Sequence, residues 1–373
     1  MTRREWLALA ASAPLLKAAP SAPTAPVAVA KCPSYNEDLT AKLSTMFDQL
    51  GGLERIVRGK TVTVKLNLTG SPALRFQGRP LGVTHYTHPK LVGATAHLMG
   101  KAGAKRIRFV ESAWATSGPL EEYMLDAGWN VRALLGAASG VEFENTNALG
   151  KGMRYSRLKV PGSPYIYPAF DLNHAFEDTD VFVSMAKLKN HETCGVTLSL
   201  KNCFGNSPAS TYGDDAGVDE PNENPTSGRG AVCHAGQRQP SKSALPEIDP
   251  ASSRDPGYRV PHIVADMCAA RPIDLAIIDG IESIAGGEGP WIQRNLKLVQ
   301  PGVLIAGTNP VTTDAVATAV MGYDPRAKRG SKPFETCDNT MLLAEVHGIG
   351  TSDLRRIEVV GVPIKQALYR YES

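Results

Sequence analysis

The sequence predicts an α/β protein with a mostly parallel central sheet flanked by helices and a long irregular insertion. Short apolar runs alternate with helical patterns along most of the chain, which is the pattern of strands joined by crossover helices. A segment rich in Gly, Pro, Asn, Asp and Ser interrupts this alternation over residues 206–259. With 373 residues, the chain can bury one large core or two modest ones.

The predicted elements follow one another regularly. Strands are predicted over Val27–Cys32, Thr61–Lys65, Arg106–Val110, Val141–Glu144, Val181–Met185, Leu275–Ile278, Val303–Ala306 and Ile357–Val360. Helices are predicted over Glu37–Leu50, Pro89–Gly100, Leu120–Ala127 and Val311–Met321. Proline favours the first position of a helix, so Pro89 and Pro310 mark two helix starts, and Asn309 is the expected cap of the second.

The insertion at 206–259 is too long for an ordinary connection, and such loops are either functional or disordered. Arg229, Cys233 and His234 within it could cover a site. Its composition favours a mobile excursion.

Residues 1–26 have the pattern of an export signal followed by a Pro/Ala-rich linker. A basic start with Arg3 and Arg4 precedes a short apolar run, Trp6–Leu16, and a stretch of small residues. The paired arginines, together with Lys17 after the apolar run, resemble a twin-arginine signal. This predicts the twin-arginine export machinery as a partner and a periplasmic or other extracytoplasmic location for residues 27–373. A disordered amphipathic N-terminus is the alternative.

Composition excludes several classes of function. The 40 basic and 37 acidic residues nearly cancel, and no run of Lys or Arg indicates a nucleic-acid groove. No apolar stretch approaches the roughly 20 residues that span a bilayer. The six cysteines include no C-x-x-C pair, which argues against an iron–sulfur cluster. Buried free thiols are expected, with one disulfide after export as the alternative.

Polar side chains follow the predicted strands where the strands end. Ligands of open α/β sheets bind beyond the carboxyl ends of the strands, so these side chains are expected to line one crevice. They are Lys65 and Asn67, Glu111 and Ser112, Lys187 and Lys189, Asp279 and Gly280, and Thr308 and Asn309.

The block Asp180–Gly205 is the most informative stretch of the chain. If its backbone stays extended, Lys187, Lys189 and His191 share one face, and Thr197, Ser199 and Lys201 share one face of the returning segment. Lysines beside apolar strand are costly to desolvate unless an anion or a carboxylate meets them. The block, including Asn202, therefore predicts an anion-facing site. The alternative is a sheet edge whose lysines deter aggregation.

Three weaker signals complete the candidate site. His88 precedes a helix start, where backbone N–H groups attract anions, although a capping role is the alternative. Gly287 and Gly289 belong to a glycine-rich run that forms either an anion-binding nest or a turn. Asp279 with Glu288 or Asp314 could hold a hard divalent cation through oxygen atoms, whereas Asp314 could instead interact with its own helix dipole.

These observations favour an enzyme that acts on a small anionic molecule, a carboxylate or phosphate compound. Its cofactor is unknown, and a divalent metal is optional. The residues expected to be catalytic are Lys187, Lys189, His191, Lys201, Glu111 and Asp279. Those expected to bind ligand are Lys65, Asn67, His88, Asn202, Gly287, Gly289 and Asn309. The rival hypotheses are a periplasmic ligand- or cofactor-binding protein without catalysis and a redox protein using Cys194 and Cys203.

An ordered set of motifs resembles the DUF362 family. The matching pieces are VKLN (64–67), THP (87–89), FVES (109–112), KLKNH (187–191), VTLSLKNCFG (196–205), IIDGI with GGEGP (277–290), TDAVATAVMG (313–322), HGIG (347–350) and VVG (359–361). The resemblance implies one family domain over 27–373. Some members append a ferredoxin-like cluster domain, whose cysteines this sequence lacks. The family name records no established reaction, so the resemblance places a site without naming its chemistry.

Overall fold

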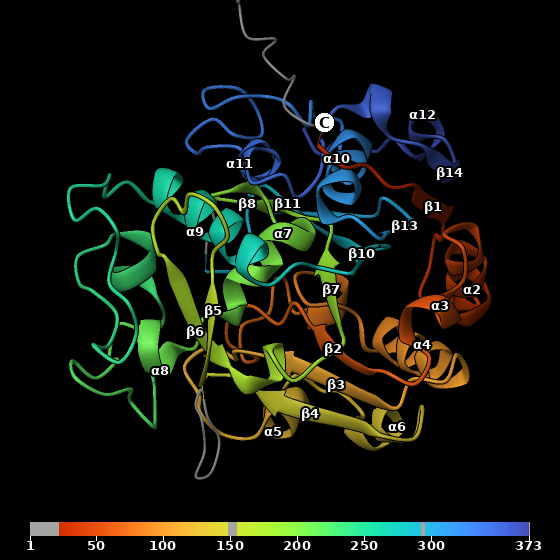
Figure 1. The fold of residues 1–373 in the computed structure, drawn as a ribbon. Coiled ribbons are helices and arrows are strands. Elements are labelled where there is room, and N and C mark those ends of the chain that lie inside the picture. The colour runs from red at the N-terminus through yellow and green to blue at the C-terminus, as the bar shows by residue number, and fades with distance from the viewer. Residues whose placement is uncertain (1–21, 148–154, 292–294, 373) are drawn as a thin grey trace, which may run out of the picture.

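The computed structural model describes residues 22–147, 155–291 and 295–372. Its centre is an eight-stranded sheet in the order β14-β1-β13-β10-β7-β2-β3-β4 (Figure 1). Its strands are β1 (Val27–Lys31), β2 (Thr61–Lys65), β3 (Arg106–Glu111), β4 (Val141–Asn145), β7 (Val181–Lys187), β10 (Leu275–Gly280), β13 (Val303–Gly307) and β14 (Val359–Gly361). The predicted fold class is confirmed.

One strand runs against the others. β13 pairs antiparallel with both β1 and β10, whereas the other described neighbours in this sheet pair in parallel. The carboxyl ends of β2, β3, β7 and β10 therefore meet at one edge of the sheet, and β13 ends at the opposite edge.

Two hydrophobic cores lie on the two faces of the sheet. Alternate residues of one strand enter opposite cores because side chains alternate across a sheet: Leu275 and Ile277 pack into one core, and Ala276 and Ile278 into the other. Five helices cover the first face: α2 (Leu39–Gln49), α3 (Leu53–Val57), α4 (Pro89–Lys101), α5 (Leu120–Asp126) and α6 (Val131–Leu135). Five others cover the second: α7 (Leu198–Asn202), α9 (Pro256–Ala270), α10 (Pro310–Val320), α11 (Thr340–Val346) and α12 (Ile364–Ala367).

Three small sheets surround the central one. They pair β5 (Tyr155–Lys159) with β6 (Ala169–Asn173), β8 (Asn190–His191) with β9 (Gly195–Val196), and β11 (Ser283–Ala285) with β12 (Lys297–Val299).

The insertion packs against the body of the protein, contrary to the expected mobile excursion. It contains α8 (Ala209–Tyr212) and a π-helical turn, Gly230–His234, and it buries Val232 and Cys233. Its last residues, which were expected to be loop, form the first turn of α9.

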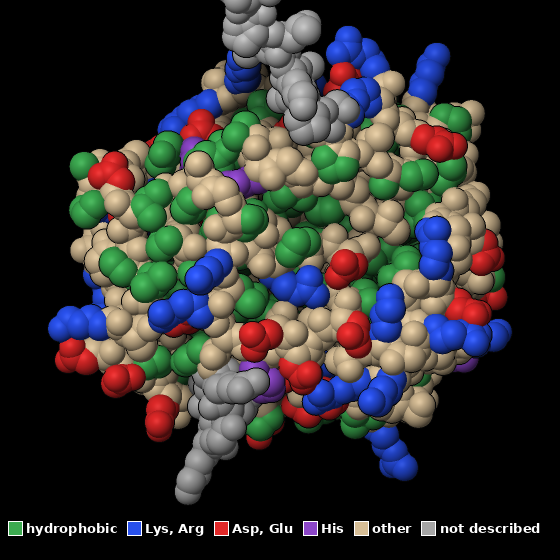
Figure 2. All heavy atoms as spheres, viewed as in Figure 1, with side chains coloured by type: hydrophobic (Ala, Val, Ile, Leu, Met, Phe, Trp, Pro, Cys, Tyr) green, Lys and Arg blue, Asp and Glu red, His purple; other side chains and the backbone are tan. Residues whose placement is uncertain are grey.

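The surface offers no evident docking feature on the face shown in Figure 2, where acidic and basic side chains are interspersed. This matches the near-neutral net charge of +3. None of the described helices is both long enough and apolar enough to cross a bilayer.

Candidate functional site

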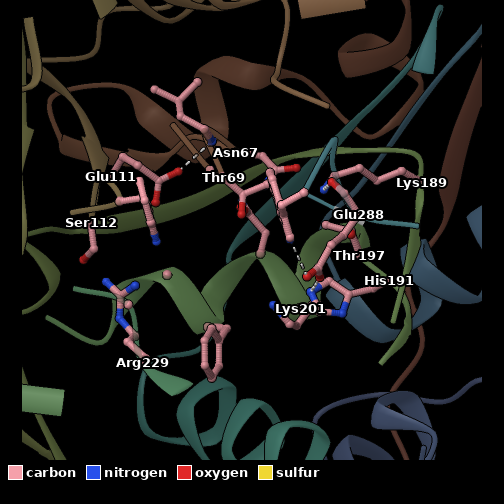
Figure 3. Close-up of a pocket in the computed structure, with 18 of the residues that line it drawn as sticks. Asn67, Thr69, Glu111, Ser112, Lys189, His191, Thr197, Lys201, Arg229 and Glu288 are labelled. Atoms are coloured by element: carbon pink, nitrogen blue, oxygen red, sulfur yellow. Dashed lines mark hydrogen bonds and ion pairs between the residues drawn. The ribbon is translucent and has the colours of Figure 1, made fainter. Parts of the chain in front are cut away.

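A cavity of about 460 Å³ opens beyond the carboxyl ends of β2, β3 and β7 (Figure 3). The start of α7, the insertion and the loop that follows β11 complete its wall. Eight of the predicted site residues line it: Lys65, Asn67, Glu111, Lys189, His191, Lys201, Asn202 and Glu288. The predicted crevice is therefore present at the expected edge of the sheet.

A buried ion pair joins the ends of β2 and β3 at the cavity. Lys65 Nζ lies 2.5 Å from Glu111 Oε1, and it also donates to the Leu66 carbonyl at 2.7 Å. The second oxygen of Glu111 accepts the Leu68 N–H at 2.7 Å. Gly205 packs directly over the pair, because a Cβ there would lie 2.8 Å from Lys65 Nζ and 2.9 Å from Glu111 Oε1. The 3₁₀ turn Cys203–Asn206 that follows α7 therefore packs against the pair.

Asn67 has a polar group without a partner. Its backbone is fixed by the Thr87 hydroxyl, which accepts the Asn67 N–H at 3.2 Å. Its side chain is 5% exposed, and among the described residues nothing hydrogen-bonds its buried Oδ1. Buried polar atoms are normally satisfied, so this amide is available to a ligand in the cavity.

The returning segment of the central block is helical, so the predicted alternation of Thr197, Ser199 and Lys201 is wrong. Asp314 of α10 causes the turn: its carboxylate accepts the Ser199 and Leu200 N–H groups, each at 2.9 Å, and the Ser199 hydroxyl at 2.6 Å. Ser199 therefore points away from the cavity, whereas Thr197 and Lys201 line it. Asp314 therefore positions the start of α7.

Lys201 faces the cavity without a carboxylate partner. Its Nζ lies 4.5 Å from the centre of the Phe204 ring. No acidic side chain in the described part of the chain comes within ion-pair distance of it. Burial lowers the pKa of Lys201.

His191 and Glu288 form a second pair at the cavity wall. His191 Nδ1 accepts the Thr193 N–H at 3.2 Å, so the ring proton lies on Nε2, which contacts Glu288 Oε2. Burial lowers the pKa of His191 to about 3, and Glu288 opposes this only in part. Burial raises the pKa of Glu288, but His191, Lys201 and Lys189 outweigh it and hold that pKa well below its usual range. At neutral pH a neutral imidazole therefore donates to a carboxylate.

Lys189 also lines the cavity. Its Nζ donates to the main-chain carbonyl of Glu288 at 2.7 Å. Burial lowers its pKa to about 7, opposed by Glu288 and reinforced by Lys201 and Lys187. Lysine at such a pKa can gain or lose a proton at neutral pH, as general acid–base chemistry requires.

We expect this lysine to make stability depend on pH. Its pKa is lower in the folded than in the unfolded chain, so between about pH 7 and 10 the unfolded state binds the extra proton and stability rises with pH. Lys189 contributes a slope of at most about 1.4 kcal/mol per pH unit to the free energy of unfolding. Urea unfolding of wild type and Lys189→Met across this range measures it: the wild type should gain stability relative to the variant as pH rises. Parallel curves would contradict the assignment.

The insertion contributes Arg229 and His234 to the wall. The guanidinium of Arg229 donates to the Ser207 carbonyl at 2.7 Å and to Asn147 Oδ1 at 2.8 Å, and none of the described carboxylates pairs with it. His234 Nδ1 lies 3.1 Å from the Arg229 carbonyl, so it carries the ring proton and leaves Nε2 as an acceptor. The insertion thus covers the site, the role that its composition disfavoured.

The cavity has an excess of positive charge. Its described lining contains four basic side chains, Lys65, Lys189, Lys201 and Arg229, but only the carboxylates of Glu111 and Glu288. Three of these cations, Lys189, Lys201 and Arg229, have no carboxylate partner among the described residues. An anion would satisfy them.

Lys187 and Asp279, which were expected to be catalytic, form a separate closed network. Lys187 Nζ donates to Asp279 Oδ2 at 3.0 Å, Tyr35 Oη at 2.8 Å and the Gly82 carbonyl at 2.6 Å, which uses all three of its protons. Asp279 also accepts from the Tyr35 hydroxyl and from the His88 N–H. Both charged side chains are fully buried. They stabilise the fold beneath the site and do not line the cavity.

His88 acts as a helix cap. Its Nδ1 accepts the Lys90 N–H at 3.2 Å, and its ring stacks on Tyr35 with centroids 3.6 Å apart. Asn309 is the cap of α10 and donates to the Ile349 carbonyl. It lies at the far edge because β13 is antiparallel. Neither residue lines this cavity.

Gly287 and Gly289 do not form an anion-binding nest around the cavity. The loop presents the Glu288 carbonyl and carboxylate, which are acceptors. Gly289 makes room for an aromatic ring: a Cβ there would lie 2.2 Å from Trp291.

The predicted metal ligands are not brought together. Asp279 pairs with Lys187, Glu288 with His191, and Asp314 with α7. Within the described residues, no group of three His, Cys, Asp or Glu side chains could hold a metal ion.

Aromatic and hydroxyl side chains are the part of the lining that sequence reasoning missed. Trp114 and Trp291 lie at the cavity and remain 47% and 39% exposed. Trp291 Nε1 donates to Glu288 Oε1 at 3.2 Å. Each tryptophan closely follows a polar motif, FVES or GGEGP, which is the signal that could have found it. Thr69 and Phe204 are further members of the lining that were not predicted.

All six cysteines are buried and free, as expected. Burial raises the pKa of Cys194 and keeps it a thiol. Cys203 packs into the core with its Sγ 3.6 Å from the Ser199 carbonyl. These surroundings favour packing over redox chemistry.

Comparison with known proteins places the matched region across the site. The model of a family described as "Domain of unknown function (DUF362)" matches residues 62–319. A thylakoid-associated protein of Synechocystis sp. is 29% identical over 189 residues, which cover 48% of this chain and 50% of that protein. The match thus spans about half the length of this curated relative. A crystal structure of a Thermotoga maritima protein is similar with a TM-score of 0.35 and 14% identity, covering 68% of this chain and 51% of that one.

Proposed function

This chain belongs to the DUF362 family, and we propose that its cavity binds a small anionic molecule, a carboxylate or phosphate compound, and catalyses proton transfer on it. The observation that most strongly supports anion binding is that Lys201 and Arg229 face the cavity with no carboxylate partner among the described residues. Unpaired cations in a partly desolvated wall are costly, and an anionic ligand offsets that cost.

The proton-transfer part rests on the groups beside those cations. Lys189 has a pKa of about 7, and His191 presents its Nε2 proton to Glu288 next to it. A group that titrates near neutral pH serves as acid or base in the same site. Lys201 and Arg229 would stabilise negative charge that develops on the ligand.

Thermal unfolding with a panel of small solutes tests the binding. Succinate, phosphate, choline and glycerol represent two anions, a cation and a neutral solute. We expect saturable stabilisation by an anion, abolished in Lys201→Met and retained in Lys105→Met, an exposed lysine before the start of β3. Stabilisation only by choline or glycerol would refute the proposal.

Proton transfer is tested on whichever anion binds. Incubation in D₂O followed by NMR detects deuterium entering its C–H positions. Substitution Lys189→Met is expected to slow exchange about 10²–10⁴-fold, because Lys189 is the group with a pKa of about 7. Tight binding without exchange would identify a binding protein.

We also propose that residues 1–26 direct export through the twin-arginine machinery. Residues 1–21 lie outside the described structure. Residues 22–24 dock on the body: the Pro23 carbonyl accepts the buried Thr351 N–H at 3.0 Å, and the Thr24 hydroxyl donates to Arg356 O at 3.0 Å. Cleavage before Ala22 would preserve these contacts.

Cell fractionation tests the export proposal. The substitutions Arg3→Lys and Arg4→Lys together keep the charge but remove the arginine pair, so we expect the protein to remain in the cytoplasm. The matched control is Lys17→Arg. Unchanged fractionation of the double variant would show that the arginines do not direct export.

A further inference from the structure

The cavity has two separate cationic ends. Lys189, His191, Lys201 and Glu288 lie on one side of it, and Glu111, Ser112 and Arg229 on the other (Figure 3). Lys65 belongs to the second end through its ion pair with Glu111. Among the described residues, Lys201 at the first end and Arg229 at the second have no carboxylate partner, and Lys189 at the first end donates to the main-chain carbonyl of Glu288.

The aromatic rings of Phe204 and His234 lie beside Lys201 and Arg229. Lys201 Nζ lies over the Phe204 ring at 4.5 Å. The edge of that ring meets His234, with ring centroids 5.1 Å apart. His234 in turn bonds the Arg229 carbonyl at 3.1 Å. The His234 contact is with the main chain of Arg229, and Figure 3 shows the side chains of Lys201 and Arg229 on different sides of the cavity.

The positions of the two cations are fixed by the fold. Asp314 holds the start of the helix that carries Lys201, through three hydrogen bonds of 2.6–2.9 Å. Two of the Arg229 donors are used by Ser207 O and Asn147 Oδ1. The remaining donors of its planar fork are free to meet a carboxylate or a phosphate.

We propose that the ligand is a diacid whose two acidic groups are held one at Lys201 and one at Arg229, with an apolar or aromatic body between them over Phe204. This rests on the proposed function, because it specifies the anion that the same cavity takes. A monoanion would leave one of the two cations uncompensated, which is costly in a buried site.

Isothermal titration of the full chain compares diacids with matched monoanions. The probes are the straight-chain dicarboxylates from succinate to pimelate and terephthalate, each beside its monomethyl ester. We expect the best-fitting diacid to bind at least about 10-fold more tightly than its ester, as one charge-assisted contact implies. In Lys201→Met and in Arg229→Met, that preference should vanish. The exposed-site variant Lys105→Met should keep it.

The outcomes separate the two proposals. Equal affinities of wild type for diacids and their esters would overturn the diacid assignment and leave anion binding standing. Failure of every anion, phosphate included, to bind would overturn the proposed function itself. If a methionine variant unfolds, Lys201→Gln and Arg229→Gln replace it. A diacid preference that survives both glutamine variants would place the second acidic group elsewhere and refute the assignment.

Discussion

Replacing Asp279 with alanine is expected to lower the free energy of unfolding by about 3–5 kcal/mol, the cost of breaking a buried ion pair from one side. Lys187 and Asp279 are both fully buried, and Lys187 would retain an ammonium group without a charge partner. The Tyr35 hydroxyl and the His88 N–H would lose their acceptor as well. Urea unfolding followed by circular dichroism measures the loss.

The double variant Lys187→Met with Asp279→Leu is the matched control. It removes both charges together, so it should recover much of the lost stability, since paired apolar residues often replace a buried ion pair at little cost. Tyr35→Phe removes only a hydroxyl of the same network, so it should lower the free energy of unfolding by a smaller amount, about 1 kcal/mol. An Asp279→Ala protein as stable as wild type would contradict the structural role assigned to this pair.

The double variant Lys201→Met with Arg229→Met is expected to lower the affinity for an anionic ligand at least about 100-fold, because two charge-assisted contacts are lost and each contributes about tenfold or more. Its free energy of unfolding should fall by no more than about 1–3 kcal/mol, since the hydrogen bonds of Arg229 to Ser207 O and Asn147 Oδ1 are lost but no described carboxylate is left unpaired. Titration calorimetry and thermal unfolding of the same samples give both quantities.

The outcome of this second experiment distinguishes binding from packing. Unchanged anion affinity in a folded double variant would show that the cavity is not the anion site. A loss in the free energy of unfolding well beyond that of the two Arg229 hydrogen bonds would show instead that these cations are needed mainly for packing. The control variant carries two exposed substitutions, Lys101→Met and Lys105→Met, and should resemble wild type in both measurements.

The central sheet was predictable because its signals are local. Each of its eight strands carries an apolar run that the sequence shows directly, and helix starts such as Pro89 and Pro310 are marked by their prolines. The direction of β13 was not predictable, because strand pairing depends on the whole topology. Because β13 is antiparallel to its neighbours, Asn309 lies at the edge of the sheet opposite to the cavity.

The site was predictable where it depends on strand ends and not where it depends on tertiary contacts. Lys65, Glu111 and Lys189 follow β2, β3 and β7 and reach the cavity as expected. Lys187 and Asp279 meet at neighbouring strand ends, as expected, but they pair with each other in a buried network and do not line the cavity.

Two further parts of the site needed the folded structure. The helical start at Leu198 depends on Asp314, which lies more than a hundred residues away. The position of Arg229 depends on an insertion whose composition resembles a mobile loop. Long-range hydrogen bonds of this kind leave no periodic pattern in a sequence.

Mass spectrometry of the small molecules that co-purify with the protein expressed in its native cells tests the central claim most directly. Wild type and the Lys201→Met, Arg229→Met double variant are purified side by side, and the compounds released by denaturation are compared. The account predicts an acidic compound on wild type that the double variant lacks. A cationic or uncharged compound, or an acidic one retained equally by both proteins, would contradict it.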